Sequence, residues 1–301
     1  MTMDDYLYDP AAPPAEDVVE IERRLQPLRY QPRNVVAFRK RRRLPLLAAA
    51  AAVVLVLAGA AWLWTWPSGR SWKVEGGPIA RLVVGETVQP EQSMLVRVAR
   101  IGWMRVTQNS TVTLESTSSN RHRLAMSSGA IRVSVWAPPR SITIRTPAGD
   151  VTDLGCEFVV RADEKATSVD VVSGWVQLDN ETGDVLVPGG AFSEMQLGGQ
   201  PSVPVFHSAT PEFRSAARTF DVETLLRTAR RRDVLTLLML ARRHPQHRDA
   251  LLVRAQELYA PKSEETVLRA RAGHDDAIWG WVGDLPLPPA KGWVRNWRDL
   301  R

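Results

Sequence analysis

Hydrophobic and polar residues alternate along the middle of the chain. The alternation is clearest in residues 131–135, 142–145 and 169–171, and short segments rich in Gly, Pro, Asn and Asp separate such runs. A period of two is typical of strands with one buried face. About ten short strands at a spacing of roughly 8–12 residues predict an all-β domain over residues 67–204, folded as a sandwich, a barrel or a solenoid.

The period changes to that of amphipathic helices in residues 205–301. Leucine and alanine recur at helical spacing in residues 222–229, 234–241 and 251–258. Asp221 and Asp233 are candidate N-caps, and proline follows two of these segments. Helices of about ten residues with short breaks predict a small antiparallel bundle or a stack of helical hairpins.

Residues 44–66 contain no charged side chain and are rich in Leu, Val and Ala. A helix of this length is roughly 34 Å long, enough to cross a hydrocarbon layer of about 30 Å. Cations precede the segment and tryptophans lie at its far end, which are the features of a membrane helix whose N-terminal side is cytoplasmic. The cations are Arg39, Lys40, Arg41, Arg42 and Arg43, and the tryptophans are Trp62, Trp64 and Trp66.

Two other interpretations of residues 44–66 remain open. A buried helix of a soluble protein is one, and a cleavable signal peptide is the other, because Ala58-Gly59-Ala60 resembles a cleavage site. The long segment before the apolar run and its continuation past Ala60 favour an uncleaved, single-pass anchor.

The first 43 residues have their acidic side chains in residues 1–22 and their basic ones in residues 23–43. Val18, Ile21 and Leu25 have helical spacing, and Pro27 ends the segment. An isolated helix of about 11 residues is marginal in water, so this apolar face either docks on a partner or has no function. The basic half suits contact with anionic lipid headgroups.

Composition and charge exclude several functional classes. The chain has 39 basic and 33 acidic residues, which gives a net charge of +6 without a strongly basic region, so direct nucleic-acid binding is not expected. The single cysteine, Cys156, permits no disulfide within the chain and no multi-cysteine metal site. No hydrolase, metalloprotease, P-loop or dinucleotide-binding motif is present. We therefore expect a protein that is not an enzyme and needs no cofactor.

Several residues of the β region have structural interpretations. Gly155 and Gly174 lie beside alternating runs, where a bulge, a corner or close strand stacking requires glycine. We expect Cys156 to be a small core residue. Trp103, Trp136 and Trp175 are also expected in the core, with a ligand platform as the alternative.

Four segments of the β region resemble the FecR domain, over roughly residues 73–197. They are residues 124–135, "IRTPAGDVTDLGCEFVV", "VDVVSGWVQL" and "LVPGGAF". The residues that carry the resemblance are Gly129, Thr146, Pro147, Gly149, Gly155, Cys156, Gly174 and Gly189.

The resemblance implies an all-β, solenoid-like lobe on the periplasmic side of the bacterial inner membrane. It also implies a cytoplasmic segment that controls an extracytoplasmic-function sigma factor, and an outer part that receives a signal from an envelope protein or ligand. The family's cytoplasmic segment is usually longer and contains a tryptophan, which this arm lacks. An envelope-anchored binding or scaffolding protein without a transcriptional role is the alternative hypothesis.

Overall fold

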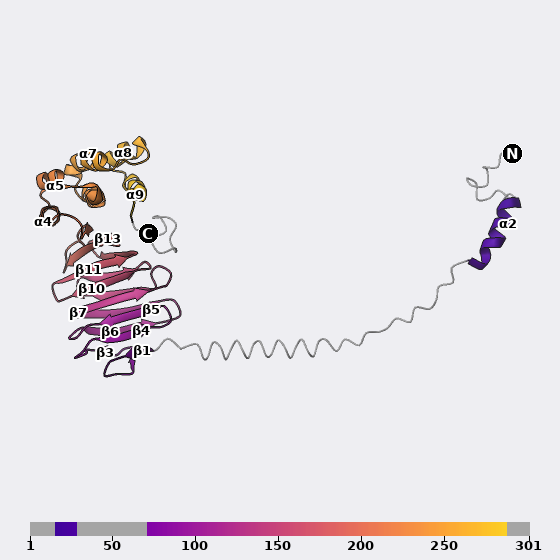
Figure 1. Ribbon diagram of the computed structural model, residues 1–301, viewed down its shortest axis with the longest axis horizontal. Helices are drawn as coiled ribbons and strands as arrows, with labels where there is room; N and C mark the ends of the chain where they lie inside the picture. The colour runs from indigo at the N-terminus through magenta and orange to yellow at the C-terminus, as the bar shows by residue number, and fades with distance from the viewer. Residues whose placement is uncertain (1–15, 29–70, 288–301) are drawn as a thin grey trace. The chain divides into compact units, whose positions relative to one another are not determined.

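The computed structural model describes residues 16–28 and 71–287 (Figure 1). The chain divides into two units, Met1–Ala61 and Trp62–Arg301, and each is described by itself. Residues 44–66, with Trp62, Trp64 and Trp66, and the cations Arg39 to Arg43 lie outside the described residues. Within the described ranges, no helix has the length and apolar character needed to cross a membrane.

The first unit contains the helix predicted in the N-terminal arm. Helix α2 is Glu16–Leu25, followed by the 3-10 turn η1, Gln26–Leu28. Acidic Glu16 and Asp17 lie in its first turn, and basic Arg23 and Arg24 lie in its last turn. Both pairs interact favourably with the helix dipole and so stabilise the helix.

The β lobe consists of two sheets that share strand β7 (His122–Val135). The first sheet has the order β2 (Arg81–Val83), β1 (Ser71–Glu75), β4 (Met94–Val98), β5 (Gly102–Val106), β7, β10 (Glu157–Ala162), β11 (Ala166–Ser173), β14 (Ala191–Gln196), β15 (Val205–Phe206). The second has the order β3 (Thr87–Val88), β6 (Thr111–Thr117), β7, β8 (Ile142–Thr146), β9 (Gly149–Asp153), β12 (Trp175–Asn180), β13 (Gly183–Pro188). All pairs are antiparallel except β7 with β8.

Strand β7 passes from one sheet to the other at Gly129. Residues 122–128 pair with β6, and residues 129–134 pair with β10. Gly129 has φ +99°, and a Cβ there would lie 2.3 Å from Ser110 Oγ. Only glycine fits this step, because any side chain would collide with the neighbouring crossing segment.

The opposite edge of the lobe has a column of glycines where later strands change sheets. Gly155 lies between β9 and β10, Gly174 between β11 and β12, and Gly189 between β13 and β14. A Cβ on Gly174 would lie 2.3 Å from the Gly155 carbonyl oxygen, and Gly189 N–H donates to the Gly174 carbonyl at 2.8 Å. The backbones stack directly here, as the interpretation of Gly155 and Gly174 anticipated.

A single hydrophobic core lies between the two sheets. Ile131, Val133 and Val135 are fully buried whereas Arg132 is exposed, so the alternation predicted from the sequence is present. Both sheets contribute large side chains to this core, including Trp72, Met104, Leu124, Phe158, Ile144 and Leu178.

Two of the three tryptophans expected in the core lie at the surface. Trp175 is 1% exposed, but Trp103 and Trp136 are 38% and 71% exposed. Trp103 occupies the outward position between Gly102 and the buried Met104 on β5, and the Arg97 guanidinium lies 5.6 Å from its ring centroid. The core prediction was therefore wrong for Trp103 and Trp136. Strand alternation places Trp103 outward despite its size, and Trp136 lies just beyond the end of β7.

Cys156 is buried in the core, as expected. The Asp153 carboxylate accepts hydrogen bonds from the Gly155 and Cys156 N–H groups at 3.0 and 2.9 Å, and from the Cys156 thiol. Asp153 thus holds the crossing segment between β9 and β10.

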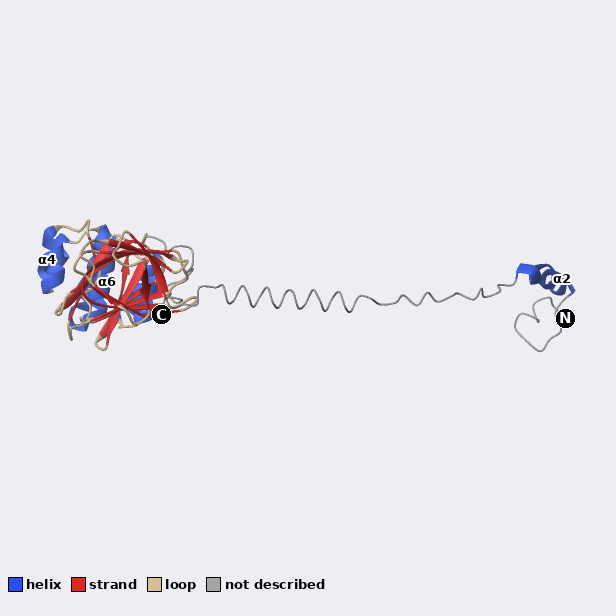
Figure 2. Cartoon of the chain, turned by 90° about the horizontal axis from the view of Figure 1, so that it is seen from below, coloured by secondary structure: helices blue, strands red, loops and turns tan. Residues whose placement is uncertain are grey.

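The helices follow the last strands, at the end of the lobe opposite β1 and β3 (Figure 1). Figure 2 shows α4 projecting to one side beyond the strands. They are α4 (Pro211–Thr219), α5 (Val222–Thr228), α6 (Val234–Arg243), α7 (Arg248–Leu258), α8 (Glu264–Arg271) and α9 (Asp275–Asp284), with 3-10 turns η2 (Arg231–Asp233) and η3 (Pro245–His247). Residues 234–241 of α6 are all buried, so α6 is the centre of the helical segment.

The Asp221 side chain caps α5 by accepting from Thr224 N–H at 3.2 Å, as predicted. Asp233 makes no such cap at α6 and instead accepts from Arg230 N–H at 2.9 Å. Asp233 therefore occupies the predicted N-cap position of α6, but its side chain does not make the predicted capping hydrogen bond.

The helical segment packs directly on the β lobe. Val205 of β15 belongs to the helical core, and Phe192 of β14 packs against it. Thr236 Oγ1 of α6 donates to the Pro204 carbonyl at 2.8 Å. Trp279 of α9 contacts a smaller cluster formed by Leu154, Trp175 and Leu186.

We predict that Gly174→Ala destabilises the β lobe more than Gly85→Ala. Both glycines have positive φ (+78° and +87°), so both variants incur a backbone strain of about 1–2 kcal/mol. Only at Gly174 would the new Cβ collide with backbone, which adds about 1–3 kcal/mol to the loss. Urea denaturation of both variants measures the difference, and equal losses would show that the glycine column is not closely packed.

Candidate functional site

The apolar face of α2 is the first candidate site. Ile21 and Leu25 are 55% and 53% exposed, Val18 is half-buried, and no residue of the helix is buried. Glu20 pairs with Arg23 at 3.0 Å and Arg24 at 3.2 Å. Val18, Ile21 and Leu25 therefore lie on a helix, as their spacing predicts. Within the described residues, none of the three is buried.

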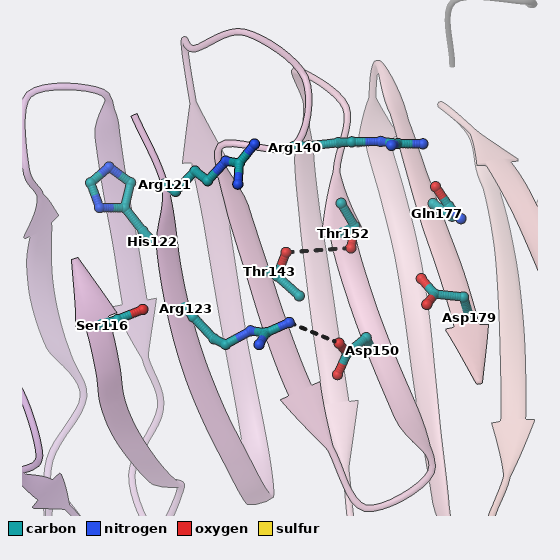
Figure 3. A pocket seen from close by; sticks show the side chains of 10 residues that line it. All are labelled: Ser116, Arg121, His122, Arg123, Arg140, Thr143, Asp150, Thr152, Gln177 and Asp179. Carbon is teal, nitrogen blue, oxygen red and sulfur yellow. Dashed lines mark hydrogen bonds and ion pairs between the residues drawn. The ribbon is translucent and has the colours of Figure 1, made fainter. Parts of the chain in front are cut away.

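A polar groove of about 520 Å³ on the outer face of the second sheet is the second candidate (Figure 3). Side chains from β6, β7, β8, β9 and β12 line it, together with Arg140 from the loop before β8. Arg123 pairs with Asp150 at 3.5 Å across the groove, and the Thr143 and Thr152 hydroxyls are 3.5 Å apart. The groove has both hydrogen-bond donors and hydrogen-bond acceptors in its lining.

Asp179, which lines this groove, has a raised pKa. Burial raises the pKa of Asp179, and the nearby carboxylates of Asp150 and Asp184 raise it further, whereas Arg140 opposes the shift. Such a carboxyl takes up a proton more readily than an ordinary aspartate.

His122 lies at the margin of the groove, in a partly buried chain of hydrogen bonds. Trp72 Nε1 donates to Thr117 Oγ1 at 3.0 Å, and Thr117 Oγ1 lies 2.7 Å from His122 Nδ1. The Trp72 ring packs edge-on against the imidazole at 5.7 Å. Burial lowers the pKa of His122, which favours the neutral imidazole.

The residues that carry the family resemblance have structural roles. Gly129, Gly155, Gly174 and Gly189 lie where the chain crosses between sheets, and Cys156 is in the core. Thr146, Pro147 and Gly149 form the β8–β9 turn, where Thr146 Oγ1 donates to the Gly149 carbonyl at 2.6 Å. The motif therefore describes how the lobe folds.

Other sequence candidates do not form a site. Asp153 caps the β9–β10 crossing, Asp150 pairs with Arg123, and Glu157 pairs with Arg132 at 2.6 Å, so these acids do not converge. Within residues 16–28 and 71–287, no group of three or more His, Cys, Asp or Glu side chains could hold a metal.

Alternation alone could have shown that Arg123, Thr143, Thr152 and Gln177 face outward on their strands. The sequence did not reveal that these strands are neighbours, because strand order depends on the crossings between sheets. The groove was therefore missed.

Residues 88–177 match the family described as "FecR protein". The resemblance to the FecR domain seen in the sequence is therefore confirmed for residues 88–177. No curated protein matches the chain.

Two crystal structures of a candidate anti-sigma factor from Parabacteroides distasonis ATCC 8503 are similar to parts of the chain. The one at 1.65 Å resolution is 18% identical, has a TM-score of 0.31, and aligns 40% of this chain with 56% of its own, so the match spans little more than half of that protein. The one at 2.50 Å is 14% identical, has a TM-score of 0.36, and aligns 46% of this chain with 74% of its own.

We predict that His122 makes the β lobe less stable in mild acid. Its folded-state pKa lies below the unfolded value of about 6.5, so the unfolded chain binds the proton more readily. The stabilisation from neutral His122 is complete above about pH 6.5 and is lost as the pH falls through the folded-state pKa. Urea denaturation at pH 7 and 5.5 should show a smaller pH-dependent loss in His122→Asn than in the wild type, and an equal loss would contradict the assignment.

Proposed function

We propose that this protein is a non-enzymatic regulator of the FecR type that relays an envelope signal to an extracytoplasmic-function sigma factor. The observation that carries the proposal is the combination, in one chain, of a FecR domain and a separate amphipathic helix whose apolar face is exposed. The FecR family match supports a role in sigma-factor regulation. The helix supplies a surface on which such a partner would dock.

The α2 face is of a suitable size for a reversible contact. Burying the exposed part of three aliphatic side chains, about half of each, is worth roughly 2–5 kcal/mol before ordering costs are subtracted, whereas micromolar binding corresponds to about 8 kcal/mol. A helix this short is marginal alone, so part of that energy orders it on the partner. The result is a contact that a moderate change elsewhere can release.

Residues 44–66 would anchor the protein in the bacterial inner membrane as a single span. The cations Arg39 to Arg43 would hold the N-terminal arm in the cytoplasm, and the β lobe and helices would lie in the periplasm. A periplasmic partner or ligand can then alter sigma-factor binding only if it has different affinities for two states of the protein.

An envelope-anchored binding protein without a transcriptional role is the second candidate. The polar groove with Arg123, Asp150 and Asp179 favours it, because its mixed donors and acceptors suit a glycan or a polar protein surface. In that case the α2 face would have no partner.

We predict that Val18→Asp with Leu25→Asp abolishes co-purification of the sigma factor from membranes. The two carboxylates would have to be desolvated at the contact, which costs far more than the lost apolar burial. Arg23→Gln with Arg24→Gln is the control, because it lowers the net charge by the same two units and leaves the apolar stripe intact. Retained association in the aspartate variant would favour the binding-protein alternative.

We predict that protease added to intact spheroplasts digests the β lobe and leaves the N-terminal arm protected. An epitope at each end of the full chain reports the two products, and a cytoplasmic protein in the same sample controls for leakage. A lobe that is protected until detergent lysis would show that the proposed orientation is inverted.

A further inference from the structure

A second groove lies where the helical segment meets the β lobe. Its volume is about 410 Å³, and it is lined by β14, by the segment before β15, and by α4 and α6. Ligand sites occur preferentially at such junctions between structural layers. The sequence patterns did not indicate that a groove lies here.

Three arginines line this groove. Arg214 and Arg218 are four residues apart on α4, and Arg243 ends α6. Among the described residues, none of the three has an ion pair or a side-chain hydrogen bond. Glu194 is the acidic residue of the lining, and it accepts a hydrogen bond from Gln196, so positive charge prevails.

Arg243 is held in an environment that favours an added anion. Burial lowers its pKa to about 10, and repulsion by Arg242 acts in the same direction, whereas Asp184 opposes them. The guanidinium remains charged at neutral pH, so a bound anion would replace solvation that it has lost.

The rest of the lining is apolar and aromatic. Phe192, Val203, Val205 and Leu240 contribute apolar surface. The Phe220 ring stacks on the His244 imidazole, with centroids 3.6 Å apart, and both residues line the groove. The groove therefore combines apolar and aromatic side chains with three guanidinium groups that have no ion-pair partner among the described residues.

Phe220 has an unusual backbone conformation. Its φ is +56°, in the left-handed region that a bulky aromatic residue seldom adopts, at the C-terminal end of α4. Residues in the left-handed region commonly end helices, and the Phe220 N–H donates to the Ala216 carbonyl, so the helix cap accounts for this conformation.

We propose that this groove binds a small organic anion, a carboxylate or a phosphate joined to an aromatic or aliphatic group. The arginines would take the anionic group, and the surface formed by Phe220, Val205 and Leu240 would take the apolar part. This inference extends the proposed sensing role by naming the ligand class. It is tested by direct binding, so its failure would leave the contact between α2 and a sigma factor untouched.

The test uses the full chain in phosphatidylcholine nanodiscs and isothermal titration calorimetry with 2-naphthoate. We expect saturable binding to one site per chain, at least about tenfold tighter than that of the neutral analogue 2-naphthylmethanol, because charged hydrogen bonds are worth that much. Titration with 2-naphthyl phosphate shows which anionic group is preferred. Equal affinities for 2-naphthoate and 2-naphthylmethanol, or no saturable binding of 2-naphthoate, would overturn the proposal.

Arg214→Gln with Arg218→Gln should weaken 2-naphthoate binding at least about tenfold. The matched control, Arg227→Gln with Arg271→Gln, removes the same two charges from exposed helix positions outside the groove and should bind like the wild type. Thermal melting of both double variants verifies that each is folded. Wild-type affinity in the first variant, or an equal loss in the control, would refute the site.

Discussion

Close backbone contact at the two edges of the β lobe is the constraint on which the remaining structure depends. Strand β7 can serve both sheets only because Gly129 leaves no side chain against Ser110. At the other edge, Gly174 lies against the Gly155 carbonyl, and Gly189 bonds to Gly174. If these crossings were wider, the two sheets could not enclose one core. Four of the residues that carry the FecR resemblance, Gly129, Gly155, Gly174 and Gly189, are thus those that let the two sheets close.

The closed β lobe also provides the surface on which the helices pack. Because the sheets enclose their own core, side chains of the last strands, Phe192, Val205 and Phe206, pack against the helices. The helical segment is therefore built on the lobe, with α6 buried at its centre. Their junction leaves a groove rich in arginine, where a ligand could change how helices and strands pack.

Helix α2 contrasts with every other helix described. Helices α4 to α9 each bury apolar residues, whereas α2 buries none. An exposed stripe of Ile21 and Leu25 has a cost in water, and a partner helix or groove would relieve it. In the proposed function, this exposed face binds the sigma factor, and the β lobe with its helices receives the envelope signal.

Much of this protein follows from local sequence patterns. Alternation placed Ile131, Val133 and Val135 inside, helical spacing placed Val18, Ile21 and Leu25 on one face, and Asp221 was recognised as a cap, because each depends on residues close in the chain. The core prediction for Trp103 and Trp136 gave more weight to their size than to the alternation around them, and the bond that Asp233 makes depends on the 3-10 turn before α6. The two grooves were decided by tertiary structure alone. Arg214 and Arg243 are far apart in sequence, and only the packing of α4 and α6 against β14 makes them one site.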